Sequence, residues 1–141
     1  MKPDSVRRFE RLYPASVAAW LAASTLSWNE RQALTARSPA LVGYEWLVPA
    51  GFAGVLALSV LIWALVRRRS PAGRVMAMVG GAFSALALLI VAGRLAVGHS
   101  TDPVATLLSL LASGLNVAAA AGLFAPTARA WFDHSDTEVL S

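Results

Sequence analysis

Hydrophobic residues fill three long, nearly unbroken runs in this sequence, at positions 46–66, 75–97 and 104–124. Each run is 21 to 23 residues long, and an α-helix needs roughly 20 apolar residues to cross the hydrocarbon core of a bilayer. Arg94 is the only charged residue inside any of them. The pattern therefore predicts three transmembrane helices.

A fourth apolar segment, 12–28, is weaker, because it has only 17 residues and several of them are serine or threonine. The loops decide how to interpret it, since cytoplasmic loops carry an excess of Lys and Arg. If this segment spans, every strongly basic segment falls on one side of the membrane. Those segments contain Lys2, Arg7, Arg8 and Arg11, then Arg67, Arg68, Arg69 and Arg74, and finally Arg129. We therefore predict an all-α, integral membrane four-helix bundle with both termini in the cytoplasm and short loops on both sides.

The chain, residues 1–141, is expected to form one membrane domain that ends in a polar tail, 133–141. The longest loop, 29–45, is expected to contain a short helix over 32–37. Aromatic residues near the span ends are expected at the membrane interface. These are Trp28, Tyr44 and Trp46 outside, and Tyr13, Trp63, Trp131 and Phe132 inside. An alternative for 12–28 is a signal peptide cleaved near 22–27, although Trp28 as an anchor favours a retained span.

Composition and charge agree with a membrane protein. The chain is 57% hydrophobic and 14% charged, whereas soluble domains average about 25% charged residues. The net charge of +4 would also suit nucleic acid, but the arginines flank apolar runs, so we expect the lipid bilayer as partner and no nucleic acid. Eleven of the twelve basic residues are arginine, a bias typical of a GC-rich genome, and we expect a bacterial plasma (inner) membrane.

Small and polar residues recur at helical spacing in the last two runs. In lipid, helices associate through close contact of small residues and through interhelical hydrogen bonds. One face of the third run carries Gly80, Ser84, Ala87, Val91 and Arg94, and one face of the fourth carries Thr106, Ser109, Ser113, Asn116 and Ala120. The connection between the two runs is short, so we expect these faces to meet in antiparallel contact or to line a shared interior.

Arg94 is the main candidate for a functional residue, because a charge within a span is a functional hypothesis by default. It lies roughly 6 Å from the outer end, at about 1.5 Å per residue, near the depth expected of Thr106 and Ser109. Glu45 or Asp102 is a candidate counter-charge. The alternative is an interface anchor whose side chain reaches the head groups.

Ser113 and Asn116 are expected deeper in the membrane than Arg94, along the same face of the fourth run. They are candidates for lining a binding site or a pathway, and the alternative is that they join helices through hydrogen bonds. His99 could add a titrating group beside Arg94, but a solvated loop histidine is the preferred interpretation.

No sequence motif of a nucleophile, a phosphate-binding loop or a metal site is present, and the chain has no cysteine. We therefore expect no metal and no cofactor, and an enzyme is the least favoured class. The leading hypothesis is a non-enzymatic accessory subunit or small-ligand-binding bundle, with a membrane-protein partner or a second copy as a further expectation. The alternative is a small transporter or channel, with Arg94 at the outer mouth of a pathway lined by the fourth span.

Overall fold

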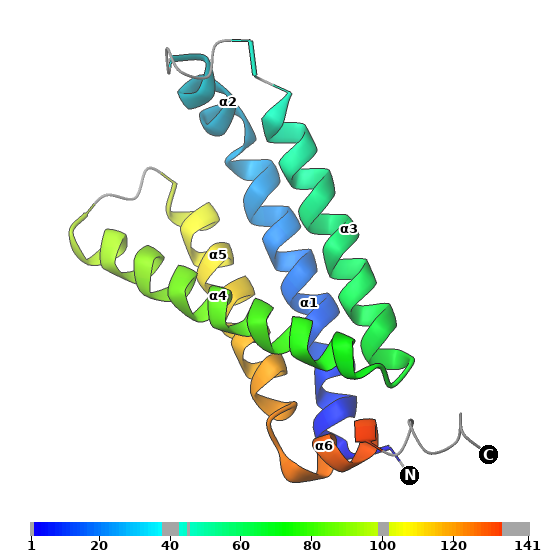
Figure 1. Ribbon diagram of the computed structural model, residues 1–141. Helices are drawn as coiled ribbons and strands as arrows, with labels where there is room; N and C mark the ends of the chain where they lie inside the picture. Colours follow the sequence, from blue (N-terminus) through cyan, green and yellow to red (C-terminus); the bar gives the residue numbers. More distant parts are fainter. Residues whose placement is uncertain (1, 38–42, 45, 99–101, 134–141) are drawn as a thin grey trace.

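The computed structural model describes residues 2–37, 43–44, 46–98 and 102–133. Its regular secondary structure is all α-helical, which confirms the predicted class (Figure 1). In chain order the helices are α1 (Asp4–Leu26), α2 (Trp28–Arg37), α3 (Leu47–Arg67), α4 (Pro71–Ala96), α5 (Pro103–Gly122) and α6 (Pro126–Asp133).

Within this described part of the chain, three helices are long and apolar enough to cross a membrane: α3, α4 and α5, with mean hydropathies of 2.1, 2.4 and 1.8. Only 6%, 11% and 22% of their apolar stretches are buried inside the protein. Most of this apolar surface is therefore expected to contact lipid or another protein and not water. The predicted first span is part of α1, which is not among the three. Its charged first turns and its hydroxyl side chains lower its hydropathy.

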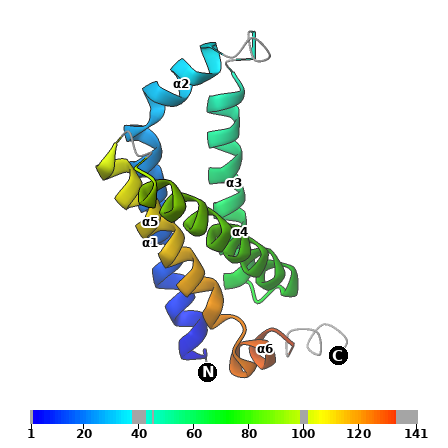
Figure 2. The same ribbon diagram turned by 90° about the vertical axis from the view of Figure 1, so that its left-hand side faces the viewer.

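In the view of Figure 1 the helices form two arms, α1 with α2 and α3, and α4 with α5, which meet at one end of the molecule and diverge toward the other. Figure 2 shows that α1 and α5 nevertheless lie side by side. α1 runs antiparallel to α5, and the contact between these two helices is the most extensive in the molecule. α4 packs on another side of α5. α3 contacts α4 more than it contacts α1. Near the diverging ends, Phe52 of α3 stacks on Trp20 of α1 and meets the edge of Trp28.

The main apolar core lies where the arms meet, which we call the basic end because the residues of the α1 start, the α3–α4 turn and α6 supply its many arginines. Val6, Phe9 and Leu123 are fully buried there. The short helix α6, which was not predicted, adds Trp131 and Phe132, at 9% and 1% exposure. These two rings therefore pack into the protein core, and their expected position at the depth of the membrane interface stays a prediction.

The turn from α3 to α4 is short and tightly bonded. The Arg69 N–H donates to the Val66 carbonyl and the Ser70 N–H to the Leu65 carbonyl, at 3.1 and 3.0 Å, which is the Schellman pattern of a helix end. Arg69 occupies the left-handed position, with φ of 58°. Gly73 follows at a point where an added Cβ would clash with Leu65, so α3 and α4 begin to diverge from nearly direct backbone contact.

The expected contact between the last two apolar runs is confirmed. The Asn116 side-chain amide of α5 donates to the Ser84 hydroxyl of α4 at 2.8 Å. The glycine of α4 that faces α5, however, is Gly81, which is buried against Ala120, whereas a Cβ on Gly80 would have nothing within 4 Å. The predicted contact face was thus wrong by one residue at its Gly80 end.

The predicted outer loop, 29–45, begins as a helix. Ser27 alone separates α1 from α2, and the Arg31 N–H still donates to the Ser27 carbonyl at 3.0 Å. The short helix expected over 32–37 is present but begins earlier, at Trp28. This continuation holds the side chains of Glu30 and Arg31 close to the bundle instead of in a free loop.

Candidate functional site

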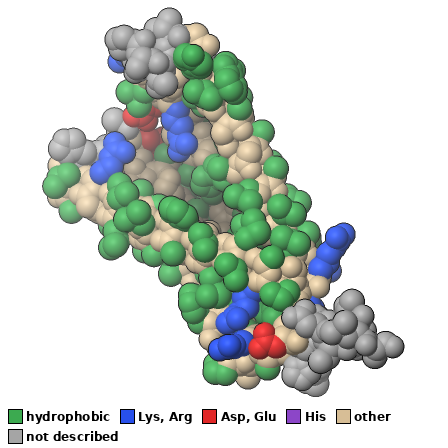
Figure 3. Space-filling model, viewed as in Figure 1, with side chains coloured by type: hydrophobic (Ala, Val, Ile, Leu, Met, Phe, Trp, Pro, Cys, Tyr) green, Lys and Arg blue, Asp and Glu red, His purple; other side chains and the backbone are tan. Residues whose placement is uncertain are grey.

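A cavity of about 230 Å³ lies at the diverging end of the bundle, which we call the open end. Figure 3 shows the molecule hollowed between the arms, with basic and acidic side chains around the upper part of the hollow. The cavity is bounded by the junction of α1 with α2 on one side and by α4 and α5 on the other. Its lining residues are Ser27, Glu30, Arg31, Leu34, Val91, Arg94, Leu95, Asp102, Ala105, Thr106 and Ser109.

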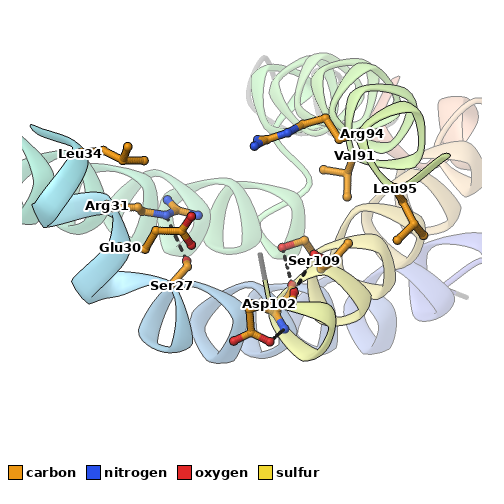
Figure 4. A pocket seen from close by; sticks show the side chains of 11 residues that line it. Ser27, Glu30, Arg31, Leu34, Val91, Arg94, Leu95, Asp102 and Ser109 are labelled. Atoms are coloured by element: carbon orange, nitrogen blue, oxygen red, sulfur yellow. Dashed lines mark hydrogen bonds between the residues drawn. The ribbon is translucent and has the colours of Figure 1, made fainter. Parts of the chain in front are cut away.

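Two guanidinium groups border this cavity. Arg94 lies in the last turn of α4 and extends toward Leu34 and Arg31 of α2 (Figure 4). Arg31 Nε donates to the Ser27 hydroxyl at 3.1 Å, so that its remaining donors are held near the same space. No ion pair joins Arg94 to any residue that the structure describes.

The opposite wall, on α5, carries two hydroxyl groups and one carboxylate, all of which are hydrogen-bonded to the α5 backbone. The Thr106 hydroxyl donates to the Asp102 carbonyl at 2.7 Å, and the Ser109 hydroxyl donates to the Ala105 carbonyl at 2.8 Å. The Asp102 carboxylate caps α5 by accepting the N–H groups of Val104 and Ala105, at 2.9 and 3.2 Å. Spare hydrogen-bond donors at this site therefore come mainly from the two arginines.

A second cavity, of about 270 Å³, lies deeper, where α1, α3, α4 and α5 all contribute. Its polar lining consists of Tyr13, Ser16, Ser59, Ser84, Ser113 and Asn116, together with the indole of Trp20. The Asn116 amide donates to Ser84, while its carbonyl oxygen is buried without a hydrogen-bond partner among the described residues. Asn116 Oδ1 is thus a buried, unsatisfied acceptor within the wall of the deep cavity.

A third hollow, of about 290 Å³, lies between the α1–α2 junction and α3. It shares Arg31 with the open-end cavity and shares Trp20 and Val55 with the deep cavity. We call the three together the cleft. The cleft runs from the open end to the level of Asn116, and below that level the buried core of the basic end fills the bundle.

The predicted site residues divide between the ends of the cleft. Arg94, Thr106 and Ser109 line the open-end cavity, and Ser113 and Asn116 line the deep one. Two other candidates, Glu45 and His99, lie outside the described residues.

Sequence reasoning missed Glu30 and Arg31, because it placed them in a loop. It also missed the α1 contribution of Tyr13 and Ser16. The available signal was the polar spacing along α1, where Tyr13, Ser16, Trp20, Ser24 and Ser27 follow one another at three or four residues.

Among the described residues, no group of three or more histidine, aspartate or glutamate side chains could hold a metal ion. The cleft offers hydroxyl and amide groups, with two arginines and two carboxylates at its mouth, and this arrangement is suited to holding a small polar molecule. No protein-family model, curated protein or solved structure matches the chain.

Proposed function

We propose that the chain is a four-span membrane protein with both termini in the cytoplasm, in which α1 crosses the membrane in addition to α3, α4 and α5. The uncharged part of α1, residues 12–26, is about 22 Å long at 1.5 Å per residue. It is shorter than the hydrocarbon core of about 30 Å, a mismatch that local thinning of the bilayer can accommodate. It lies along α5, which is itself apolar enough to span. Its Tyr13, Ser16 and Ser24 are buried against other helices, so lipid does not have to solvate them.

The function that the geometry supports best is the binding of a small ligand in the cleft. The observation that carries this proposal is the row of three neighbouring hollows, which collects most polar side chains of the four helices. A bundle that served only as a structural element would gain stability by filling this space with apolar side chains. Arg31 and Arg94 at the mouth can hold an anionic group of the ligand, because a guanidinium binds carboxylate and phosphate in a forked geometry. Glu30 and Asp102 in the same lining suit a ligand that also carries hydrogen-bond donors.

A second candidate function is transport, which is supported by the depth of Asn116 in the cleft. Against it stands the basic end, where Val6, Phe9 and Leu123 have 0% exposure. A pathway would need this core to open. Binding without passage needs no such rearrangement, so it is the preferred proposal.

Accessibility of introduced cysteines tests both the topology and the cleft, since the chain has no cysteine of its own. Ser109→Cys and Ser113→Cys should react with a membrane-impermeant methanethiosulfonate added to the outside of cells. Leu107→Cys and Leu111→Cys are matched controls on the same helix, because these leucines are 62% and 52% exposed on the outer surface of the bundle, where lipid should protect them. Equal reactivity of all four positions, or no reaction at Ser113→Cys, would contradict a water-filled cleft.

Charge selectivity tests the ligand class. A negatively charged reagent should modify Ser109→Cys faster than a positively charged one of similar size, provided that Arg31 and Arg94 outweigh Glu30 and Asp102 in the same lining. Adding Arg94→Gln should remove much of this preference. A reaction at Asn116→Cys from the cytoplasmic side, in inverted vesicles, would instead favour transport.

A further inference from the structure

A separate groove runs along the outer seam between α1 and α3, with a volume of about 280 Å³. Apart from Tyr13 and Ser59, its lining is apolar: Pro14, Val17, Ala18, Leu21, Val60 and Trp63. Tyr13, Val17 and Ser59 also line the deep cavity, so these three side chains form the wall between the groove and the cleft. The groove therefore faces away from the proposed ligand site.

The cationic side chain of Arg67 lies at the basic end of this groove. The Arg67 guanidinium carbon lies 4.7 Å from the centre of the Trp63 ring, and Arg67 Nε lies 3.9 Å from a carboxylate oxygen of Glu10. The Arg67 side chain is still 55% exposed. Its position is thus defined by the ring and the carboxylate, while most of its donors remain accessible.

Two further arginines belong to the same end of the seam. Arg11 lies one helical turn before Pro14, and Arg68 follows Arg67; both are exposed. Neither forms an ion pair with a described residue. Glu10 is the acidic group beside them, and Lys2 also pairs with it. The groove therefore ends in an excess of positive charge next to an aromatic ring.

We propose that this groove binds one acyl chain of an anionic phospholipid, whose phosphate lies against Arg67 and Arg11. An apolar slot that ends in cations at the membrane interface is complementary to a lipid tail joined to a negative head group. A second copy of the chain is a poor occupant, because in the same membrane orientation it would bring its own arginines to the same depth. The inference does not require a ligand in the cleft.

The test uses the purified full chain in a neutral detergent, titrated with phosphatidylglycerol or phosphatidylcholine and followed by native mass spectrometry. One phosphatidylglycerol should bind more tightly than phosphatidylcholine does. Arg67→Gln should weaken the binding of phosphatidylglycerol about fivefold, the contribution expected of one cation facing an anionic lipid. Ala18→Leu, at an exposed position in the groove, should weaken both lipids by occupying the space of the tail.

Matched controls separate this site from general attraction. Arg129→Gln removes a cation from the basic end that lies 3.7 Å from its own acid, Asp133, and should leave binding unchanged. Ala22→Leu lies on α1 one turn beyond Ala18, outside the groove lining, and should also have no effect. Equal affinity for the two lipids, equal loss in Arg67→Gln and Arg129→Gln, or full binding in Ala18→Leu would each overturn the proposal.

Discussion

Replacing Gly81 by alanine tests how closely α4 and α5 approach each other. Gly81 is buried on α4, and the atom that faces it is the Cβ of Ala120 on α5. A methyl group at this position would be closer to the Ala120 Cβ than the ordinary carbon contact distance, about 3.5–4.0 Å, by more than about 1 Å. Since Ala120 has no flexible end that could turn away, the helices themselves must separate.

The magnitude follows from comparing neighbouring glycines. Overpacking a tight contact costs about 1–3 kcal/mol. Alanine also favours the helix over glycine by about 0.8–1.0 kcal/mol, which opposes that cost. Gly80→Ala has the same helix term but nothing within 4 Å of the new Cβ. The difference in unfolding free energy between the two variants therefore isolates the clash, and we expect Gly81→Ala to be the less stable by about 1–3 kcal/mol.

Unfolding in mixed micelles, driven by rising SDS and followed by circular dichroism of the helices, measures this difference. Gly80→Ala should be as stable as the unmodified chain or slightly more stable. If Gly81→Ala proved as stable as Gly80→Ala, the two helices could not be in contact at Ala120. The rotation of α4 about its axis would then be wrong.

Three further predictions use the same unfolding assay. Asp102→Ala should destabilise by about 0.5–2 kcal/mol through loss of the α5 cap, whereas Asp102→Ser should retain most of the stability. A double-mutant cycle of Asn116→Val with Ser84→Ala should give a coupling energy of about 0.6 kcal/mol and no more than about 1.7, and zero coupling would contradict their hydrogen bond. Arg94→Ala and Glu45→Gln should be non-additive if the sequence-based pairing is correct; additive effects would leave Arg94 as an interface anchor.

The three apolar runs predicted their helices well, because length and continuous hydrophobicity depend on composition alone. The runs 46–66 and 104–124 correspond to α3 (Leu47–Arg67) and α5 (Pro103–Gly122). The start of α1 was misplaced by several residues, since its first turns mix arginines with buried Val6 and Phe9. The burial of Trp131 and Phe132 was not predicted, because it depends on contacts with distant segments, which no local pattern shows.

The sequence predicted which candidate site residues lie together where this depended only on their depth along a helix. Counting residues from the membrane surface put Arg94 level with Thr106 and Ser109, and the structure places all three on one cavity. Rotation about the helix axis was harder, because Gly80 and Gly81 are identical in type and either could face the partner. That these residues bind a ligand, and that both termini are cytoplasmic, stay predictions.

The packing of α1 on α5 implies an order of events during synthesis. α1 leaves the ribosome first, but its hydropathy is too low to hold it in lipid by itself. α5, the helix that α1 contacts most, is synthesised completely only when the chain has reached Gly122. In the proposed topology the segment after α1 must reach the outer side before α3 can span, so α1 has to enter the bilayer before α5 has arrived. A chain that stops translation within α4 should therefore hold α1 in the bilayer without its main packing partner, and proteases that remove incomplete membrane proteins should degrade it.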